Sequence, residues 1–484
     1  MSHRPLLLCL SILLCWLPLG AAASGFASLA ALEKEGYLVG AEARLLPIGA
    51  EPGRTLGSIA PSLELSPASV TKVYTAAAAL DKLGPQHRFT TRLVSLARPD
   101  ANGVLAGDLI FEGGGDPALT SEDLWRLTQR LYQAGVREVS GQLVISQWRF
   151  GPVECLTTDR CRARNSSDNA YSALLSSAGV NYGSWCVDVA PGSLAGQPAR
   201  ITSCDSKVRL PRIDNSVKTH LPNSGTELSA RRDSDAAGEV LRVSGQISLN
   251  AYPRQLYRAS ADPAAQAGEL LLDMLTQSGI AVRDGYATST SRPPSGARQL
   301  AAVDGKPLQE LLLRTLNYSN NFMADVLALN LVDTSRPDLA QAGAAVSAFA
   351  RGLPGHGPLT LDSGSGLTTS NRTTAAGANV MLESMFQRSS LFPSFVAGLQ
   401  SPENGVMRFI RRGSPTFQRN VMIKTGTLNQ PVAVRAMTGY FRTRSNRWGV
   451  FTVMVNGTAS TPYLSWSKVL DHVAADMEPL IESN

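Results

Sequence analysis

A serine and a lysine three residues apart, Ser69 and Lys72, form the pair in this sequence best suited to nucleophilic chemistry. On a helix this spacing places both side chains on one face. A serine hydroxyl needs a base to become a nucleophile, and a lysine amine shielded from water can serve as one. We expect Ser66 to cap the helix, with Pro67 in its first turn and Gly84 ending it. The serine would then lie near a helix N-terminus, where the dipole favours negative charge.

The same spacing occurs again near the end of the chain, at Ser465 and Lys468. A Ser-x-x-Lys pair is weak evidence by itself, because it arises often by chance and is also typical of a solvated helix face. The residues that follow Ser69 along the chain, described below, are what favour the first pair over the second.

Residues 1–23 have the features of a secretory signal. His3 and Arg4 precede an apolar run over residues 6–19, and small residues follow up to an expected cleavage site after Ala23. No later apolar run is long enough to cross a bilayer. The sequence therefore predicts an exported chain without an integral membrane segment after signal cleavage, soluble or at most peripherally attached to a membrane or wall.

Four cysteines lie beyond the predicted signal: Cys155, Cys161, Cys186 and Cys204. An even number in an exported chain indicates two disulfides, for which three pairings are possible. Proximity in sequence favours pairing the first with the second and the third with the fourth. A zinc site is the alternative, but no Cys-x-x-Cys and no neighbouring histidine supports it. We predict no metal and no cofactor.

The charge of the chain is mildly positive, at +6, and its arginines are scattered along the sequence. A solvated surface explains them, and an anionic cell-wall polymer is the alternative partner. Nucleic acid is disfavoured, since no basic stripe is interleaved with aromatic residues. The length of 484 residues predicts two or three domains.

The order of the predicted elements divides the chain beyond residue 23 into three parts. The first part, 24–86, contains a helix, a strand and the Ser69 helix. The second part, 87–258, has short strands and glycine turns, holds all four cysteines, and includes a charged, loop-like piece over 205–235. The third part, 259–484, is expected to contain helices at 264–279, 307–316 and 374–387, strands at 420–428, 434–442 and 448–455, and a closing helix at 463–481.

Two further short motifs follow Ser69 and Lys72 in the third part of the chain. Ser319-Asn320-Asn321 precedes a predicted apolar helix, and Lys424-Thr425-Gly426-Thr427 lies in a predicted strand. Alone, the first motif is typical of a helix cap and the second of a strand end. Their ordered occurrence after Ser-x-x-Lys is the three-motif set of penicillin-binding proteins and serine β-lactamases.

The chain resembles one family within that set, the D-alanyl-D-alanine carboxypeptidase/endopeptidases of the penicillin-binding protein 4 type. The first and second motifs are 250 residues apart, and a long β-rich insertion between them is similar to that family. The stretches Gly115–Thr120 and Ser363–Thr368 also resemble it. One departure is Asn320, where the family often has aspartate; this middle residue is not assigned chemistry.

The resemblance implies a fold and a site. The fold would be α+β, a β-lactamase/transpeptidase-like domain with a five-stranded antiparallel sheet flanked by helices and with inserted β-rich modules. Ser69 would attack the carbonyl carbon between two D-alanines, and Lys72 would accept the proton, helped by burial near the cation of Lys424. Ser319 would relay a proton to the leaving amine, and Asn321 would bind the substrate amide.

The strand motif would bind the other end of the substrate. Lys424 with the hydroxyls of Thr425 and Thr427 would hold the terminal carboxylate, and Gly426 would let the substrate backbone lie close to the strand. The oxyanion would sit between the backbone N–H groups of Ser69 and Thr427. Strand alternation places neighbouring side chains on opposite faces, so these roles require a twisted edge. Ser365 and its glycines are assigned to a loop outside the site.

The resemblance implies a periplasmic serine peptidase that acts on peptidoglycan stem peptides ending in D-Ala-D-Ala and is acylated by β-lactam antibiotics. A β-lactamase is the enzymatic alternative, although no glutamate can be assigned to activate water for fast deacylation. A non-catalytic wall-binding protein on the same fold is the other alternative, and it would be expected to have lost a motif residue. A Ser-His-Asp hydrolase is disfavoured, because the sequence has no Gly-x-Ser-x-Gly.

Overall fold

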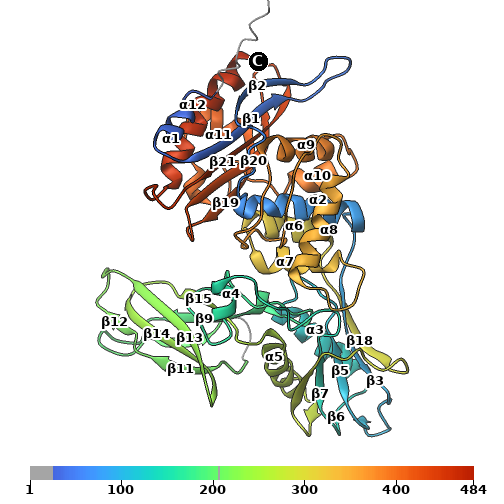
Figure 1. The fold of residues 1–484 in the computed structure, drawn as a ribbon. Helices are drawn as coiled ribbons and strands as arrows, with labels where there is room; N and C mark the ends of the chain where they lie inside the picture. The colour runs from blue at the N-terminus through green and yellow to red at the C-terminus, as the bar shows by residue number, and fades with distance from the viewer. Residues whose placement is uncertain (1–25, 205–207) are drawn as a thin grey trace, which may run out of the picture.

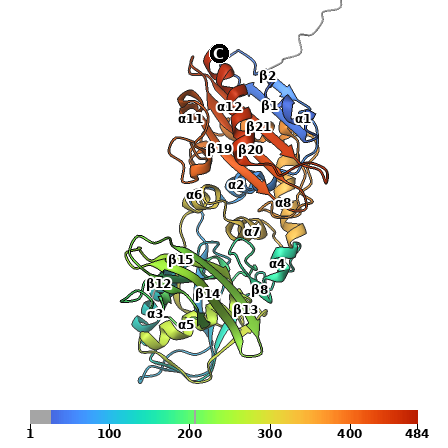
Figure 2. The same ribbon diagram turned by 90° about the vertical axis from the view of Figure 1, so that its left-hand side faces the viewer.

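The structure, a computed structural model, describes residues 26–204 and 208–484. The predicted secretory signal over residues 1–23 lies outside the described residues. The described chain forms an upper and a lower part, which meet beside the helices labelled α6 and α7 in Figures 1 and 2.

The upper part is organised around one five-stranded sheet in which every neighbouring pair of strands is antiparallel. From edge to edge its strands are β19 (Val421–Leu428), β20 (Val434–Arg442), β21 (Trp448–Asn456), β1 (Leu38–Leu45) and β2 (Arg54–Ile59). The first and last thirds of the sequence therefore share one sheet, as the blue and red ribbons show in Figure 1. This confirms the predicted sheet.

Helices cover both faces of this sheet, and alternate residues of β20 contribute to the two sides. Met437 packs into the core beneath α1 (Ala30–Lys34), α11 (Pro415–Asn420) and α12 (Trp466–Ser483), so the closing helix packs on the sheet. Ala436 packs into the core on the other face. The helices there are α2 (Thr71–Leu83), α6 (Leu308–Asn317), α7 (Asn321–Asn330), α8 (Leu339–Arg351), α9 (Ala375–Phe386) and α10 (Phe392–Val396). Within the described residues no helix is both long and apolar enough to span a bilayer.

The lower part begins with a second five-stranded sheet. Its strands are β17 (Tyr286–Ser289), β7 (Leu143–Ser146), β5 (Leu109–Glu112), β3 (Thr90–Ser95) and β18 (Arg298–Asp304). The helices α3 (Ser121–Gln133) and α5 (Pro263–Gln277) pack on it, and β16 (Ala281–Val282), β6 (Glu138–Val139) and β4 (Val104–Leu105) form a small sheet beside it. Asp262 caps α5 by accepting from the backbone N–H groups of Ala264 and Ala265.

The pairing of β18 with β3 leads us to propose a different boundary for the inserted part. A division at residue 258 would cut this second sheet, because β17 and β18 follow it in the chain and pair with strands that precede it. The two ends of the inserted part lie next to each other, because β3 and β18 are antiparallel neighbours. We therefore propose that the inserted part runs from about residue 87 to about residue 304.

Two further sheets complete the lower part. One contains β10 (Arg200–Ser203), β9 (Ser184–Ala190) and β15 (Arg254–Ala259); the other contains β11 (Arg212–Asn215), β14 (Gly238–Ser248), β13 (Glu227–Asp235) and β8 (Ser166–Ser167), with β12 (Lys218–His220) also on β14. The expectation of a loop over 205–235 is wrong for most of its described residues. Most of their charged side chains lie on exposed positions of strands whose alternate residues face inward, although Arg232 of β13 is itself buried.

Both disulfides pair neighbouring cysteines, as the sequence favoured. Cys155 is bonded to Cys161 and Cys186 to Cys204. The first bond closes a short loop that contains the helix α4 (Thr158–Arg162), which lies at the junction of the upper and lower parts in Figures 1 and 2.

The segment before α2 differs from the expected helix start. Residues Ala68–Val70 form a 3-10 turn, η1, so Ser69 lies in this turn and precedes the α-helix itself. Ser66 does not cap the helix: its hydroxyl is buried without a hydrogen-bond partner among the described residues. Its backbone is held instead by Asn456 of β21, whose Oδ1 accepts from Ser66 N at 2.8 Å and whose Nδ2 donates to Ser66 O at 3.2 Å.

This contact generates a prediction about stability. Replacing Asn456 with alanine leaves the buried N–H and C=O of Ser66 unpaired, and we expect the free energy of unfolding to fall by about 1–3 kcal/mol. Urea denaturation followed by circular dichroism measures the change. Asn102→Ala, at an exposed turn of the inserted part, is the control and should change stability little. Equal effects of the two substitutions would contradict this account.

Candidate active site

The first predicted pair lies at the base of the upper part, with the hydroxyl at the surface and the amine inside. Ser69 is half-buried, whereas the side chain of Lys72 is fully buried. Lys72 Nζ lies 2.9 Å from Ser69 Oγ. The amine also donates to Asn321 Oδ1 at 2.7 Å and to the carbonyl oxygen of Ser365 at 2.6 Å. Three polar atoms from three segments therefore surround one buried nitrogen.

The second predicted motif occupies the turn between α6 and α7. Ser319 has a positive φ of 52°, a conformation that is uncommon for a residue other than glycine and is often found at functional sites. Asn320 caps α7 by accepting from Met323 N at 3.0 Å, a role that aspartate fills equally well. Asn321 directs Oδ1 to Lys72, while its Nδ2 donates to the carbonyl oxygen of Tyr171 at 3.0 Å.

The third predicted motif brings a second buried amine to the same place. Lys424 of β19 is almost fully buried, and its Nζ donates to Ser319 Oγ at 2.9 Å and to the carbonyl oxygen of Thr425 at 2.6 Å. The structure thus brings together Ser69, Lys72, Ser319, Asn321 and Lys424 from three distant segments.

Burial controls the charge of both amines. Desolvation lowers the pKa of Lys72 well below its ordinary value, and the nearby cation of Lys424 lowers it further, whereas the Asp325 carboxylate opposes this shift. Desolvation also lowers the pKa of Lys424, to about 7. Burial therefore favours the neutral form of the Lys72 amine, and the charge of Lys424 changes near neutral pH.

The strand β19 lies directly against the segment that carries Ser69. A Cβ on Gly426 would lie 2.4 Å from the carbonyl oxygen of Pro67 and 2.9 Å from Ser69 N. Any larger residue would push the strand away from the serine. The sequence predicted that a substrate approaches the backbone closely at Gly426. The structure adds a second reason why this position needs a glycine, which is its contact with the turn that carries Ser69.

The other face of β19 carries the two threonines of the motif. Thr427 Oγ1 accepts from Trp466 Nε1 of α12 at 2.8 Å, on the face opposite to the one that Gly426 turns toward Ser69. Thr425, two residues before Thr427, shares that face, so the expected alternation holds. Binding of the substrate carboxylate by the two hydroxyls stays a prediction. Binding of the oxyanion by the backbone N–H of Thr427 also stays a prediction.

The loop around Ser365 belongs to the site, which corrects its assignment to a loop outside it. The carbonyl of Ser365 accepts a hydrogen bond from Lys72, and the loop also packs against the turn that holds Ser69. A Cβ on Gly366, whose φ is +77°, would lie 1.8 Å from the carbonyl oxygen of Ala68. The sequence signal was the Ser363–Thr368 stretch, which had been noted as a resemblance without a role.

Sequence reasoning also missed three residues around the cluster. Tyr171 supplies its carbonyl to Asn321 from the inserted part. Asp325 and Arg160 form an ion pair of 2.8 Å in which both side chains are almost completely buried. Asp325 could have been found, since it follows Asn321 by one helical turn in an otherwise apolar helix. Arg160 carried no signal that distinguishes it from the many surface arginines.

The second Ser-x-x-Lys pair has a structural role. Ser465 caps α12 by accepting from Lys468 N at 3.2 Å, and the amine of Lys468 pairs with Glu35 on the surface. The lysine of this pair is at the surface rather than buried beside its serine, so the pair differs from Ser69 and Lys72.

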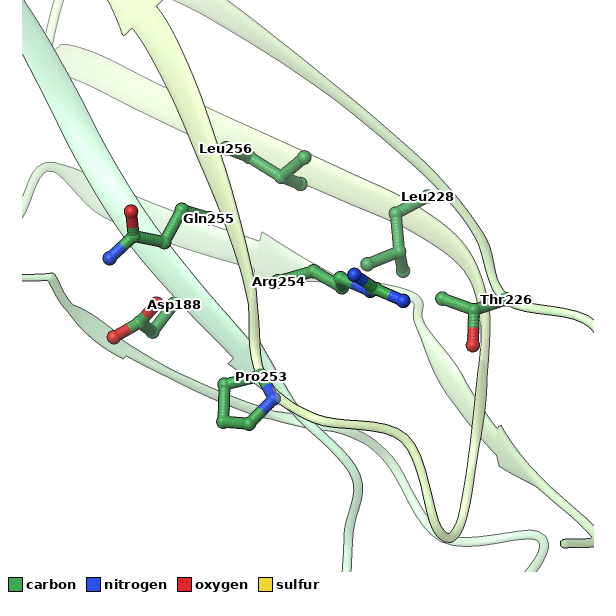
Figure 3. A pocket seen from close by; sticks show the side chains of 7 residues that line it. All are labelled: Asp188, Thr226, Leu228, Pro253, Arg254, Gln255 and Leu256. Atoms are coloured by element: carbon green, nitrogen blue, oxygen red, sulfur yellow. The ribbon is translucent and has the colours of Figure 1, made fainter. Parts of the chain in front are cut away.

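A separate cavity lies away from this cluster. It is an open groove of about 770 Å³ in the inserted part. Figure 3 shows its lining, formed by Asp188, Thr226, Leu228, Pro253, Arg254, Gln255 and Leu256. None of the residues predicted for the site lines it, and the grouping of its side chains does not place a nucleophile beside a base.

Known proteins resemble this chain over most of its length. It is 29% identical over 433 residues to a D-alanyl-D-alanine carboxypeptidase of Actinomadura sp. strain R39, covering 85% of this chain and 77% of the relative. It is 27% identical over 410 residues to the D-alanyl-D-alanine carboxypeptidase DacB of Haemophilus influenzae, covering 81% and 80% of the two chains.

Solved structures share the fold. Penicillin-binding protein 4 (dacB) of Haemophilus influenzae superposes with a TM-score of 0.73 at 21% identity, covering 94% of this chain and 99% of that chain. A predatory endopeptidase of Bdellovibrio bacteriovorus, in complex with an immunity protein, superposes with a TM-score of 0.52 at 15% identity, covering 92% and 94%.

The family model that matches spans almost the whole described chain. It covers residues 27–476 and therefore includes both halves of the sheet, the inserted part and all three motifs of the cluster. The chain belongs to the D-Ala-D-Ala carboxypeptidase 3 (S13) family.

Proposed function

We propose that this protein is an exported serine-type D-Ala-D-Ala carboxypeptidase/endopeptidase that cleaves peptidoglycan peptides through an acyl-enzyme on Ser69. The observation that carries the proposal is the environment of Lys72, whose buried amine lies 2.9 Å from Ser69 Oγ. Membership of a family of D-Ala-D-Ala carboxypeptidases supports the substrate class.

The contacts of Lys72 suit a neutral amine. A neutral amine has two N–H donors and one lone pair, and the carbonyl of Ser365 and Oδ1 of Asn321 provide acceptors for the two donors. The lone pair is then left for the Ser69 hydroxyl, which donates to it. Lys72 is in this way prepared to act as the general base.

In the proposed acylation step, Ser69 Oγ forms a bond to the carbonyl carbon of the scissile peptide while its proton passes to Lys72 Nζ. The carbon–nitrogen bond then breaks, and the leaving amine takes a proton from Ser319, which takes one in turn from Lys424 through their contact at 2.9 Å. In the hydrolysis that follows, water attacks the ester and gives a proton back to Lys424 through Ser319, while Lys72 returns its proton to the Ser69 oxygen as the ester bond breaks. A β-lactam would acylate the same hydroxyl by opening its ring, with no amine released.

Two activities fit this chemistry, and they differ only in the leaving group. Release of a terminal D-alanine is carboxypeptidase action, and cleavage of a cross-link between two peptides is endopeptidase action. The carboxypeptidase relatives and the endopeptidase with the same fold make both part of the proposal. The substrates would be stem peptides ending in D-Ala-D-Ala.

Export to the periplasm is part of the proposal. The apolar run in residues 1–23 is typical of a secretory signal, and two disulfides indicate an oxidising compartment.

The nucleophile can be tested with a matched pair of substitutions. Ser69→Ala removes the attacking oxygen, and we expect acylation by a fluorescent penicillin to fall by roughly 10⁴-fold or more. Ser465→Ala removes only a helix cap and should leave labelling intact. The measurement is in-gel fluorescence of purified, folded protein, followed by mass spectrometry of digested muropeptides. Labelling of Ser69→Ala would refute the assignment, and rapid turnover of penicillin by the unmodified protein would favour a β-lactamase.

The close approach of β19 to Ser69 gives a second prediction. In Gly426→Ala the added methyl group must displace the strand from the turn, because its Cβ would lie 2.4 Å from Pro67 O. We expect the second-order rate of acylation to fall by roughly 100-fold, the effect typical of misplacing reacting groups by about 1 Å. Gly225→Ala, where the nearest atom is 3.9 Å away, is the control. Unchanged acylation of Gly426→Ala would contradict the packing argument.

The lowered pKa of Lys424 gives a third prediction. This amine is charged below its pKa of about 7 and neutral above it, so binding of the substrate carboxylate should weaken, and the second-order acylation rate should fall, as the pH rises through 7. Arginine stays charged across this range, so Lys424→Arg should lose the fall even though its overall rate is lower. Lys468→Arg is the surface control. A fall at the same pH in Lys424→Arg would assign it to another group.

A further inference from the structure

A buried chain of polar contacts connects the inserted part to the base of the proposed reaction. Arg160 Nη1 donates to Asp325 Oδ2 at 2.8 Å, and Asp325 Oδ1 accepts from Ser365 N at 2.8 Å. The carbonyl of Ser365 in turn accepts from Lys72 Nζ at 2.6 Å. Asp325 is fully buried, and the exposed fraction of Arg160 is only 2%.

The position of Arg160 is fixed by its own short element. It lies on α4, whose first turn is capped by Thr157, with Oγ1 accepting from Arg160 N at 3.4 Å. The next residue, Cys161, is bonded to Cys155. One arginine of the inserted part therefore reaches the upper part from a short helix that is held by a disulfide.

The pair is not explained by stability alone. Nε and Nη2 of Arg160 are buried without a hydrogen-bond partner among the described residues. A buried ion pair with unsatisfied donors is weak evidence for stability, because desolvation of the two charges offsets their attraction. A role at the site, next to the second motif, accounts better for its placement.

We propose that Arg160 and Asp325 are a positioning pair through which the inserted part of the chain holds the Ser365 loop against Lys72 and balances the charge around it. The inference rests on the proposed function and extends it. Neither residue touches the reacting atoms: Asp325 acts through the Ser365 backbone and through its field, and Arg160 acts through Asp325.

Charge gives the two partners opposite effects on the base. The described groups that act on the Lys72 amine are the cations of Lys424 on β19 and Arg160 on α4, which lower its pKa, and the carboxylate of Asp325 on α7, which raises it. Removing Arg160 should therefore raise the pKa of Lys72, and removing the Asp325 charge should lower it.

The experiment is a pH profile of acylation by penicillin for purified variants. Because Lys72 must be neutral, the rising limb of the profile reports its pKa. In Arg160→Gln we expect this limb to move up by about one pH unit, and in Asp325→Asn down by a similar amount. The double variant should return toward the unmodified profile. All rates should also fall at least several-fold, because the Ser365 loop loses its support.

Control variants distinguish a positioning role of the pair from a loss of folding, and the unmodified protein tests the proposed function itself. Arg162→Gln removes an exposed arginine from the same helix and should leave the profile unchanged. Arg160→Lys keeps the charge, so its limb should stay in place even if Arg160→Gln does not fold. The proposed role of the pair would be overturned if the rising limb of the pH profile did not move, or if it moved in the same direction in Arg160→Gln and Asp325→Asn. An unmodified protein that penicillin never acylates would instead refute the proposed function.

Discussion

The burial of two lysine amines side by side is the constraint on which the rest of the structure depends. A charged amine removed from water is costly unless it is paired or loses its proton. Lys72 and Lys424 are both buried, and within the described residues the hydrogen bonds of their amines go to hydroxyl, amide and carbonyl oxygens rather than to carboxylates. The site therefore favours the neutral form of at least one amine, which is the form that can take a proton from a serine.

The fold supplies this environment by bringing four segments, distant from one another in the sequence, together beside the strand β19. The strand β19 brings Lys424 and, through the absence of a side chain at Gly426, approaches the turn that carries Ser69. The turn before α7 brings Ser319 and Asn321, and the Ser365 loop closes the buried side. The long inserted part also takes part, because Tyr171 and Arg160 reach the same cluster from it. The proposed site is thus shared between the two parts of the molecule.

Much of this arrangement could be predicted from the sequence, because each motif has a local signal. The Ser-x-x-Lys spacing, the polar turn before an apolar helix and the strand with Gly426 are all visible as patterns, and so are the strands of the sheet. Long-range packing was not visible. The pairing of β3 with β18, on which we base the proposed boundary at about 304, joins strands more than 200 residues apart in the sequence. Ser66 does not cap the helix but is held through its backbone by Asn456, and Arg160 resembles any other arginine in the sequence. These features depend on residues far apart in the chain, whose contacts leave no local periodicity.

The central claim, a Lys72 amine whose pKa is held well below the ordinary lysine value, can be measured directly by nuclear magnetic resonance titration of protein labelled at the lysine side chains. Comparison with Lys72→Met assigns its signal. The account predicts that the Lys72 signal titrates well below the value of about 10.4 that is ordinary for lysine. A Lys72 signal that titrates at the ordinary value in the folded protein would contradict it.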